Sequence, residues 1–166
     1  MADEQTRSEY RFTIDVGQFQ NDLPQAVNLA ANDRDGLAQL MLDAYRGSID
    51  DEGETFEEAG EAIDFYLGNC LAAHSWVATQ DGAPIGMSLV LIVEANGLHY
   101  IDPVAVSALH KQQGLGRRLV HASLASLADA GVREVGATIT DGNVPSERLF
   151  ANLGANRVGP WPPEPH

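Results

Sequence analysis

Apolar residues recur every three to four positions after residue 36, which predicts a helix. They are Leu37, Leu40, Met41, Ala44 and Tyr45. Asn32 or Asp33 can cap the N-terminus of this helix, and Gly47 can end it. A second helix is predicted after Thr55 and Glu58, which form a capping box. Its apolar positions are Phe56, Ala59, Ile63, Tyr66, Leu67 and Cys70.

Strand-like alternation and turn sequences dominate the middle of the chain. Residues 76–79, 85–94 and 98–106 are predicted strands. Asp81-Gly82 and Asn96-Gly97 lie between them, and such dipeptides favour two-residue hairpin turns. We therefore expect these strands to form an antiparallel meander. A short strand is also predicted upstream, at residues 26–30.

The pattern alternates between helix and strand from residue 114 onward. A helix is predicted over residues 114–130, with an apolar face wide enough to be buried against a sheet. A strand follows at 134–139, a helix at 145–153 and a short strand at 157–158. Antiparallel strands followed by a β-α-β unit predict an α+β fold, in which helices cover both faces of a mixed sheet.

The two ends of the chain differ from its centre. Residues 1–23 are polar, with one alternating patch formed by Tyr10, Phe12 and Ile14. This segment is either an edge strand or a disordered arm. We expect a single domain over residues 24–160, because a chain of 166 residues suits one domain. Residues 161–166 are expected to form a proline-rich tail.

The composition narrows the range of partners. The formal charge of −14 argues against binding to nucleic acid or to an anionic membrane surface, which relies on lysine and arginine. No apolar run reaches the roughly 18–20 residues needed to cross a bilayer. The single cysteine, Cys70, excludes an intrachain disulfide, fits a cytoplasmic location and is interpreted as a small core residue. The histidines and cysteine have no metal-ligand spacing, so no metal site is expected.

Candidate chemistry gathers where the third long helix is predicted to begin. Lys111, the only lysine, precedes Gly114 and Gly116, and Arg117 and Arg118 follow them. A strand, a glycine-containing loop and a helix N-terminus commonly bind phosphate, because the first N–H groups of a helix lack partners. The loop lacks the Lys-Ser/Thr ending of a P-loop and the third small residue of a dinucleotide fingerprint.

Two motifs resemble those of the GNAT N-acetyltransferase superfamily. Residues 111–116, Lys-Gln-Gln-Gly-Leu-Gly, are similar to the Gln/Arg-x-x-Gly-x-Gly/Ala loop that grips the pyrophosphate of acetyl-CoA in that family. Residues 143–150, Asn-Val-Pro-Ser-Glu-Arg-Leu-Phe, are similar to its Asn-x-x-Ala-x-x-Leu-Tyr motif. The resemblance covers residues 26–158 and implies the GNAT acyl-CoA N-acyltransferase fold, with a mostly antiparallel central sheet.

The resemblance implies an N-acetyltransferase that moves an acetyl group from acetyl-CoA to a primary amine, by direct attack in a ternary complex. The backbone N–H of Val106 would face the thioester oxygen as an oxyanion donor. Pro103, which has no N–H, is placed to form a bulge that opens the sheet beside it. The implied acetyl-CoA-binding residues are Val104, Val106, Lys111, Gln112, Gln113, Gly114, Leu115, Gly116, Arg117, Arg118, Asn143 and Phe150.

The acid and base groups depart from the family pattern. Phe150 stands where the family often has a tyrosine acid, so a non-catalytic acyl-CoA-binding or regulatory protein is the alternative. Tyr100 matches the position of the glutamate base in histone-type members, whereas Asp102 is the better catalytic base by chemistry. Asp102 is otherwise a solvated carboxylate or one that satisfies the bulge. Both residues should share a strand face with Val104 and Val106, unless the bulge shifts the alternation.

The acceptor side of such an enzyme would be acidic. Residues 50–54, Asp-Asp-Glu-Gly-Glu, lie between the first two predicted helices, where the family usually selects its substrate. A carboxylate-rich rim would attract a protonated amine, in a small molecule or on a peptide. The alternative is a solvated loop whose acids lie favourably near a helix N-terminus. Dimers are common in the family, so a homodimer is one expected assembly.

Overall fold

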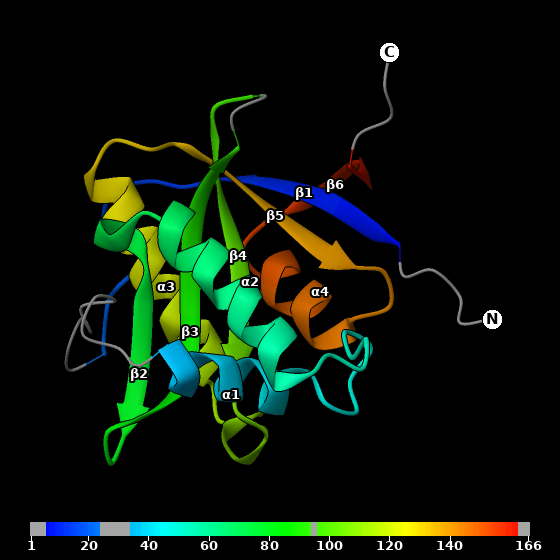
Figure 1. Ribbon diagram of the computed structural model, residues 1–166. Coiled ribbons are helices and arrows are strands. Elements are labelled where there is room, and N and C mark those ends of the chain that lie inside the picture. The colour runs from blue at the N-terminus through cyan, green and yellow to red at the C-terminus, as the bar shows by residue number, and fades with distance from the viewer. Residues whose placement is uncertain (1–5, 24–33, 94–95, 163–166) are drawn as a thin grey trace.

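The computed structural model describes residues 6–23, 34–93 and 96–162. Its strands are β1 (Arg7–Thr13), β2 (Trp76–Gln80), β3 (Ala83–Val93), β4 (Leu98–Val106), β5 (Glu134–Thr140) and β6 (Asn156–Trp161). Its helices are α1 (Arg34–Tyr45), α2 (Phe56–Asn69), α3 (Leu115–Asp129) and α4 (Val144–Ala151), with the 3-10 turns η2 (Ala72–His74) and η3 (Ala108–His110). The strands form one six-stranded sheet in the order β2-β3-β4-β5-β1-β6 (Figure 1).

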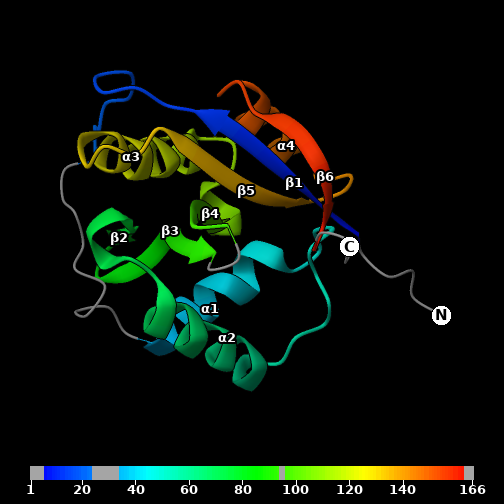
Figure 2. The ribbon, with the colours of Figure 1, turned by 90° about the horizontal axis from the view of Figure 1, so that it is seen from above.

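Helices cover both faces of this sheet. Figure 2 shows α1 and α2 on one side, and α3 and α4 on the other. On the first side, Leu37, Leu40 and Ile63 pack against strand residues such as Met87 and Leu89. On the second side, α3 and α4 pack against inward-facing residues of β3, β4, β5 and β1. The predicted mixed sheet with two helical layers is confirmed, and burial of these two apolar clusters is its main stabilisation.

Short-range sequence signals form the local structures they predict. The Thr55 Oγ1 accepts from the Glu58 N–H at 3.1 Å, and the Glu58 carboxylate accepts from the Thr55 N–H at 3.1 Å, which completes the capping box of α2. Asp81 and Gly82 both adopt positive φ angles, 53° and 82°, as a type I′ hairpin turn requires. Strands β2, β3 and β4 form the expected antiparallel meander. The two-residue turn expected at Asn96-Gly97 is wrong, because Val93 pairs with Leu98 and the connection between them is four residues long.

The N-terminal segment does form a strand, but not at an edge of the sheet. Strand β1 pairs antiparallel with β5 on one side and with β6 on the other. Phe12 and Ile14 bury their side chains beneath it, with 4% and 1% of their surface exposed. Strand β6 is the edge strand instead, and it continues through Pro160 to Trp161. The strand expected at residues 26–30 and the caps at Asn32 or Asp33 lie outside the described residues.

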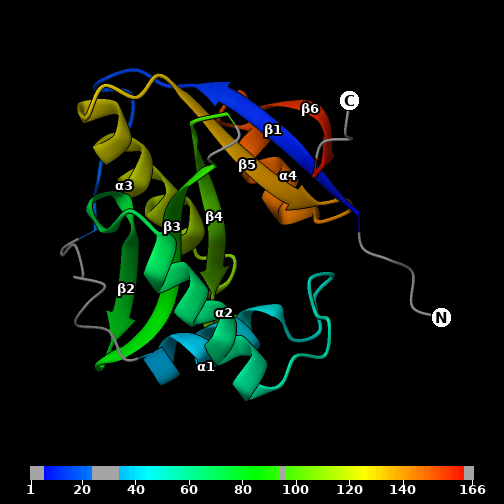
Figure 3. The ribbon, with the colours of Figure 1, turned by 45° about the horizontal axis from the view of Figure 1, so that its top comes forward.

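Strands β4 and β5 pair over only a short stretch. Their parallel pairing covers His99 to Ile101, although β4 continues to Val106 (Figure 3). The pairing of β4 with β3 shifts register just beyond this point, between Ser88 and Val90. Two β4 residues, Asp102 and Pro103, lie there opposite the single β3 residue Leu89, so the bulge expected at Pro103 is present. The sheet opens between β4 and β5 from this bulge onward.

A glycine on β5 makes room for a buried tyrosine at the paired end of these strands. A Cβ atom on Gly136 would lie 2.7 Å from the ring of Tyr100. We predict that Gly136→Ala lowers the free energy of unfolding by about 1–3 kcal/mol, because the rigid ring must move. Thermal or urea unfolding measures the loss. Gly159→Ala on β6, where a Cβ atom would meet nothing within 4 Å, should be nearly neutral; equal losses in both variants would contradict the prediction.

Candidate active site

The larger pocket occupies the opening between β4 and β5. It has a volume of about 560 Å³ and is formed by the end of α1, the end of β4, the loop before α3 and the start of α4. Most of the predicted acetyl-CoA-binding residues line it. They are Val104, Val106, Lys111, Gln112, Gly114, Leu115, Gly116, Arg117 and Asn143. The fold therefore brings together two sequence motifs that are about thirty residues apart.

The start of α3 presents unpaired backbone N–H groups to this pocket. Gly114 is the N-cap residue, in the left-handed conformation (φ 79°), and no side chain caps the helix. The first helical hydrogen bond runs from the Arg118 N–H to the Gly114 carbonyl, at 3.1 Å. The N–H groups of residues 115–117 precede that bond and so have no acceptor within the helix. Together with the helix dipole, they form an arrangement suited to an anion such as a phosphate.

The basic residues around the loop point in different directions. Lys111 and Arg117 line the pocket, and the Lys111 ammonium also donates to the Ala44 carbonyl at the end of α1. Arg118 does not line it, because its guanidinium is paired with the Asp22 carboxylate at 2.9 Å. Successive helical residues are about 100° apart, so the side chains of Arg117 and Arg118 leave α3 in different directions.

Two further predicted contacts lie away from the larger pocket. The Gln113 side chain donates to the Leu109 carbonyl at 3.3 Å, within its own loop. Phe150 has only 4% of its surface exposed, and its ring centroid is 6.0 Å from that of Phe12 in the core beneath α4. It borders the smaller pocket described below instead. Its helical position directs it into the core, as the apolar pattern around it requires.

The backbone N–H of Val106 points into the opening. The Ser107 N–H donates to the Ile85 carbonyl at 2.9 Å, so those two residues form a hydrogen-bonded pair. Val106 and Gly86 are the next pair along. Hydrogen-bonded and non-bonded pairs alternate in antiparallel ladders, so the Val106 N–H is directed away from β3. This is the geometry that an oxyanion donor at Val106 needs.

A smaller pocket adjoins the larger one. Its volume is about 210 Å³, and the two share Tyr45, Asp50, Val104, Asn143 and Ser146. Four carboxylates border it, together with Arg7 and the rings of Tyr45 and Tyr66. The carboxylates are those of Asp50, Glu52, Glu54 and Asp102. The predicted acidic loop therefore lies against a pocket rather than only facing solvent.

Asp102 lies inside the smaller pocket, next to the bulge. Burial raises the pKa of its carboxyl group above the ordinary value, and the nearby Asp50 carboxylate adds to the effect. The Arg7 guanidinium lies 3.7 Å from the Asp102 carboxylate, and its positive charge lowers the pKa of Asp102 and partly offsets this rise. A carboxylate with a raised pKa holds a proton more readily at neutral pH, which suits a general base.

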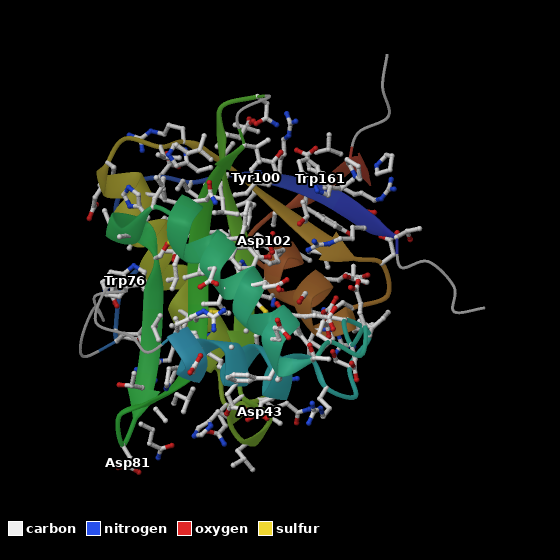
Figure 4. All side chains as sticks on the ribbon, in the orientation of Figure 1. Asp43, Trp76, Asp81, Tyr100, Asp102 and Trp161 are labelled. Carbon is white, nitrogen blue, oxygen red and sulfur yellow. The ribbon has the colours of Figure 1, made fainter. Side chains whose placement is uncertain are left out.

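Tyr100 lies outside both pockets, contrary to its predicted role. Its hydroxyl donates to the Glu9 carboxylate and accepts from the Asn96 amide at 3.0 Å. Its ring centroid is 5.5 Å from that of Trp161, and Figure 4 shows both residues at the end of the sheet beyond Asp102. It closes the paired end of β4 and β5 and has no access to the opening.

The four β4 residues do not share a face, because the bulge shifts the alternation, which is the exception stated for this expectation. Ile101 belongs to the core beneath α3, so Tyr100 and Asp102 face the α1–α2 side. Val104 packs against the α3 core, whereas Ala105 belongs to the α1–α2 core. The bulge at Asp102 and Pro103 therefore reverses the alternation, as such an insertion does. Asp102 and Val106 consequently approach the opening from opposite faces of the sheet.

Several site residues were missed in the sequence. Tyr45 and Tyr66 were assigned only to apolar helix faces, and Arg7 was assigned to the N-terminal arm. Asp50 has a specific role, since its carboxylate accepts from the Thr140 hydroxyl and from the Asn143 amide at 2.9 Å. These bonds hold the loop after α1 against β5 and α4. The contribution of these residues to the site becomes visible only in the folded structure, because they come from distant parts of the sequence.

Within residues 6–23, 34–93 and 96–162, no cluster of three or more potential metal ligands occurs. No helix in the same part of the chain is long and apolar enough to span a membrane.

Comparison with known proteins identifies the family. The sequence profile of the Acetyltransferase (GNAT) family matches residues 36–155, well over half of the chain. The chain belongs to the GNAT family. No curated protein sequence matches it. Its GNAT membership therefore rests on the family profile, and the fold agrees with it.

Solved GNAT structures share the fold at low sequence identity. A GCN5-related N-acetyltransferase from Sphaerobacter thermophilus has a TM-score of 0.69 and 15% identity, covering 94% of this chain but 49% of its own. This GNAT chain thus spans about half the length of that protein. The ribosomal-protein-S18-alanine N-acetyltransferase of Escherichia coli has a TM-score of 0.60 and 18% identity, covering 78% and 74%. A diaminobutyrate acetyltransferase from Paenibacillus lautus, solved with coenzyme A, has a TM-score of 0.53 and 22% identity, covering 72% and 68%.

The raised pKa of Asp102 predicts a pH-dependent cost to the stability of this GNAT domain. The folded state binds the Asp102 proton more tightly than the unfolded chain does, so ionisation above pH of about 4 destabilises the fold. We predict that Asp102→Asn becomes increasingly stable relative to the natural protein as pH rises above that value. Urea unfolding at a series of pH values measures the difference in free energy of unfolding.

Asp141→Asn is the matched control for this pH series. Hydrogen bonds from Ser8 and Thr6 hold the pKa of Asp141 below its ordinary value. Its ionised form therefore stabilises the fold, and the Asn variant should become relatively less stable as pH rises. Curves of the same sign for the two variants would contradict the assignment of Asp102 as a buried, costly carboxylate.

Proposed function

We propose that this GNAT protein is an N-acetyltransferase that transfers the acetyl group of acetyl-CoA to a primary amine in a ternary complex. The observation that carries the proposal is the junction of two pockets at the β4 bulge. One pocket has the unpaired amides of α3, and the other is bordered by carboxylates. The Val106 N–H lies on the larger pocket, two residues along β4 from the shared Val104, where it would stabilise the oxyanion formed by attack on a thioester.

The larger pocket fits acetyl-CoA. Its volume lies within the roughly 300–1,000 Å³ typical of sites for small molecules and cofactors. The amides of residues 115–117, with Lys111 and Arg117, would hold the pyrophosphate. The pantetheine arm would extend along the unpaired edge of β4 beside Val104 and Val106, as an added strand. When bound, acetyl-CoA supplies the activated acyl group.

The smaller pocket fits a cationic amine. Asp50, Glu52, Glu54 and Asp102 outnumber Arg7 among its charged residues, so its field attracts a protonated amine. These four carboxylates line one pocket, which favours substrate attraction over the alternative of a merely solvated loop. Asp102 would accept the proton of the attacking nitrogen, since it borders the smaller pocket two residues along β4 from the shared Val104 and has a raised pKa.

Release of the free thiol of CoA in the presence of a panel of amines tests the activity. We predict that amines with a second positive charge react faster than uncharged analogues of equal length, and that added salt reduces the difference. Asp102→Asn should lower kcat by about 10²–10⁴-fold, as loss of a general base does. Asp43→Asn is the matched control, because Asp43 is exposed on α1 and borders neither pocket. Equal rates in both variants would contradict the role of Asp102.

Binding of acetyl-CoA is tested separately from turnover. We predict that acetyl-CoA raises the melting temperature of the natural protein, that NADH does not, and that Gly114→Glu abolishes the effect. The substitution places a carboxylate among the amides that would bind phosphate. Gly131→Glu is the matched control, because Gly131 also has a positive φ (92°) but lies beyond the opposite end of α3. If both variants respond alike, the phosphate site is not at Gly114.

The alternative function is acyl-CoA binding without turnover. The observation that favours it is Phe150, which is buried in the core and cannot donate a proton to a departing thiolate. Thiol release distinguishes the alternatives, because a binding protein would show the acetyl-CoA-dependent melting shift and no turnover with any amine. Gain of turnover only in Phe150→Tyr would favour the binding protein.

A further inference from the structure

The junction of the two pockets limits where proton transfer can occur. A thioester held along β4 in the larger pocket and an amine in the smaller pocket can react only where the pockets meet. The residues common to both pockets are Tyr45, Asp50, Val104, Asn143 and Ser146. The groups best placed to protonate the departing sulfur are therefore among these five residues.

Only two of the shared residues have a hydroxyl to donate. Val104 is apolar, and Asp50 and Asn143 are hydrogen-bonded to each other at 2.9 Å. Ser146 carries an alkyl hydroxyl, which is a far weaker acid than a phenol. A phenol, with an ordinary pKa of about 10, is a much stronger acid than an alkyl hydroxyl, so Tyr45 is the better proton donor of the two.

Tyr45 is held firmly at this position. It is the last residue of α1, and its carbonyl accepts from both the backbone N–H and the hydroxyl of Ser48, at 2.9 and 2.7 Å. The carbonyl of the preceding residue accepts from Lys111 in the glycine loop. Its ring packs against the α1–α2 core, while its hydroxyl makes no hydrogen bond to any other residue that the structure describes. The hydroxyl is therefore available to a ligand.

The charges around Tyr45 keep its hydroxyl protonated. Burial raises the pKa of Tyr45 well above its ordinary value, and Asp102, Tyr66 and Asp50 raise it further. The positive charge of Arg7 lowers the pKa of Tyr45 and so partly offsets these effects. Among the carboxylates, Asp102 raises the pKa of Tyr45 the most, so the phenol and the proposed base are electrostatically coupled. A neutral phenol beside a base suits proton donation followed by reprotonation.

We propose that Tyr45 protonates the departing sulfur of the coenzyme and so performs the task that Phe150 cannot. This inference rests on the proposed function. After the ammonium group has released one proton to solvent, the neutral amine nitrogen forms the new C–N bond and loses a proton to Asp102, and the C–S bond breaks. The sulfur takes the Tyr45 proton, and the phenol recovers a proton from Asp102. One proton leaves nitrogen and one reaches sulfur, so the products are the acetylated amine and the free thiol.

The thiol of bound CoA provides a test that does not require turnover. A phenol that donates to the sulfur stabilises the thiolate, so Tyr45→Phe should raise the pKa of the bound thiol by about one unit. Ultraviolet absorbance of the thiolate, followed during a pH titration of the protein–CoA complex, measures this pKa. Lys111 and Arg117 also border the pocket and affect the thiol pKa. They are unchanged in every variant, so their effect cancels when the thiol pKa of a variant is compared with that of the natural protein.

Two matched variants accompany Tyr45→Phe. Tyr66→Phe removes a phenol that borders only the smaller pocket, and Ser146→Ala removes the other hydroxyl at the junction. Both should leave the thiol pKa unchanged. Because the Tyr45 ring is retained, the melting temperature and the affinity for CoA should also be unchanged in Tyr45→Phe. An unchanged thiol pKa in Tyr45→Phe, or a shift in Ser146→Ala instead, overturns the proposal.

Kinetics give a second, independent measurement. With the best amine, Tyr45→Phe should lower kcat by about 100-fold and leave the KM for acetyl-CoA unchanged. A kcat within twofold of the natural protein overturns the assignment. If CoA does not bind the natural protein at all, the proposed function fails and this inference fails with it. If CoA binds and an amine is acetylated but the thiol titration is unaffected, only the role of Tyr45 is wrong.

Discussion

The separation of β4 from β5 is the constraint on which the site depends. A parallel pair normally continues to hydrogen-bond along its length, and here the pairing ends after Ile101 because the chain inserts a bulge containing Pro103. The separation leaves a strand edge, with the Val106 N–H, unpaired inside the molecule. It also creates the space that both pockets share. An unpaired backbone edge inside a fold is costly unless a ligand or water satisfies it, which is why such an opening indicates function.

The two pockets have opposite electrostatic character within a strongly acidic chain. The larger one combines the N-terminal end of α3 with Lys111 and Arg117, and the smaller one is bordered by four carboxylates. Their fields would sort an anionic coenzyme and a cationic amine to opposite sides of the same opening. Asp50 links the two sides, because it borders both pockets and is fixed by Thr140 and Asn143. The formal charge of −14 is thus distributed unevenly, with a local positive site at the glycine loop.

Signals that act over a few residues could be read from the sequence. The capping box at Thr55, the hairpin turn at Asp81-Gly82 and the bulge at Pro103 all follow from local chemistry. The sheet face to which each residue after the bulge points could not be predicted. The exact position of the extra residue decides where the alternation reverses, and that position is fixed only by the pairing of β4 with β3. Tyr100 shares a face with Asp102, but it lies at the paired end of β4 and β5 and is hydrogen-bonded to Glu9, away from both pockets. Tyr45 was missed for a different reason: its helical spacing is that of a core residue, and its ring is packed as one.

The position of β1 in the sheet affects the order in which the parts of the site fold. Arg7 and Thr140 are partners in the β1–β5 pairing, so this part of the sheet joins residues more than 130 positions apart. Such distant pairings close late, because the entropy of a long loop must be overcome before they form. The meander and α3 contain mostly nearer contacts and can form earlier. The wall of the smaller pocket that carries Arg7 is therefore expected to be among the last parts of this protein to acquire its structure.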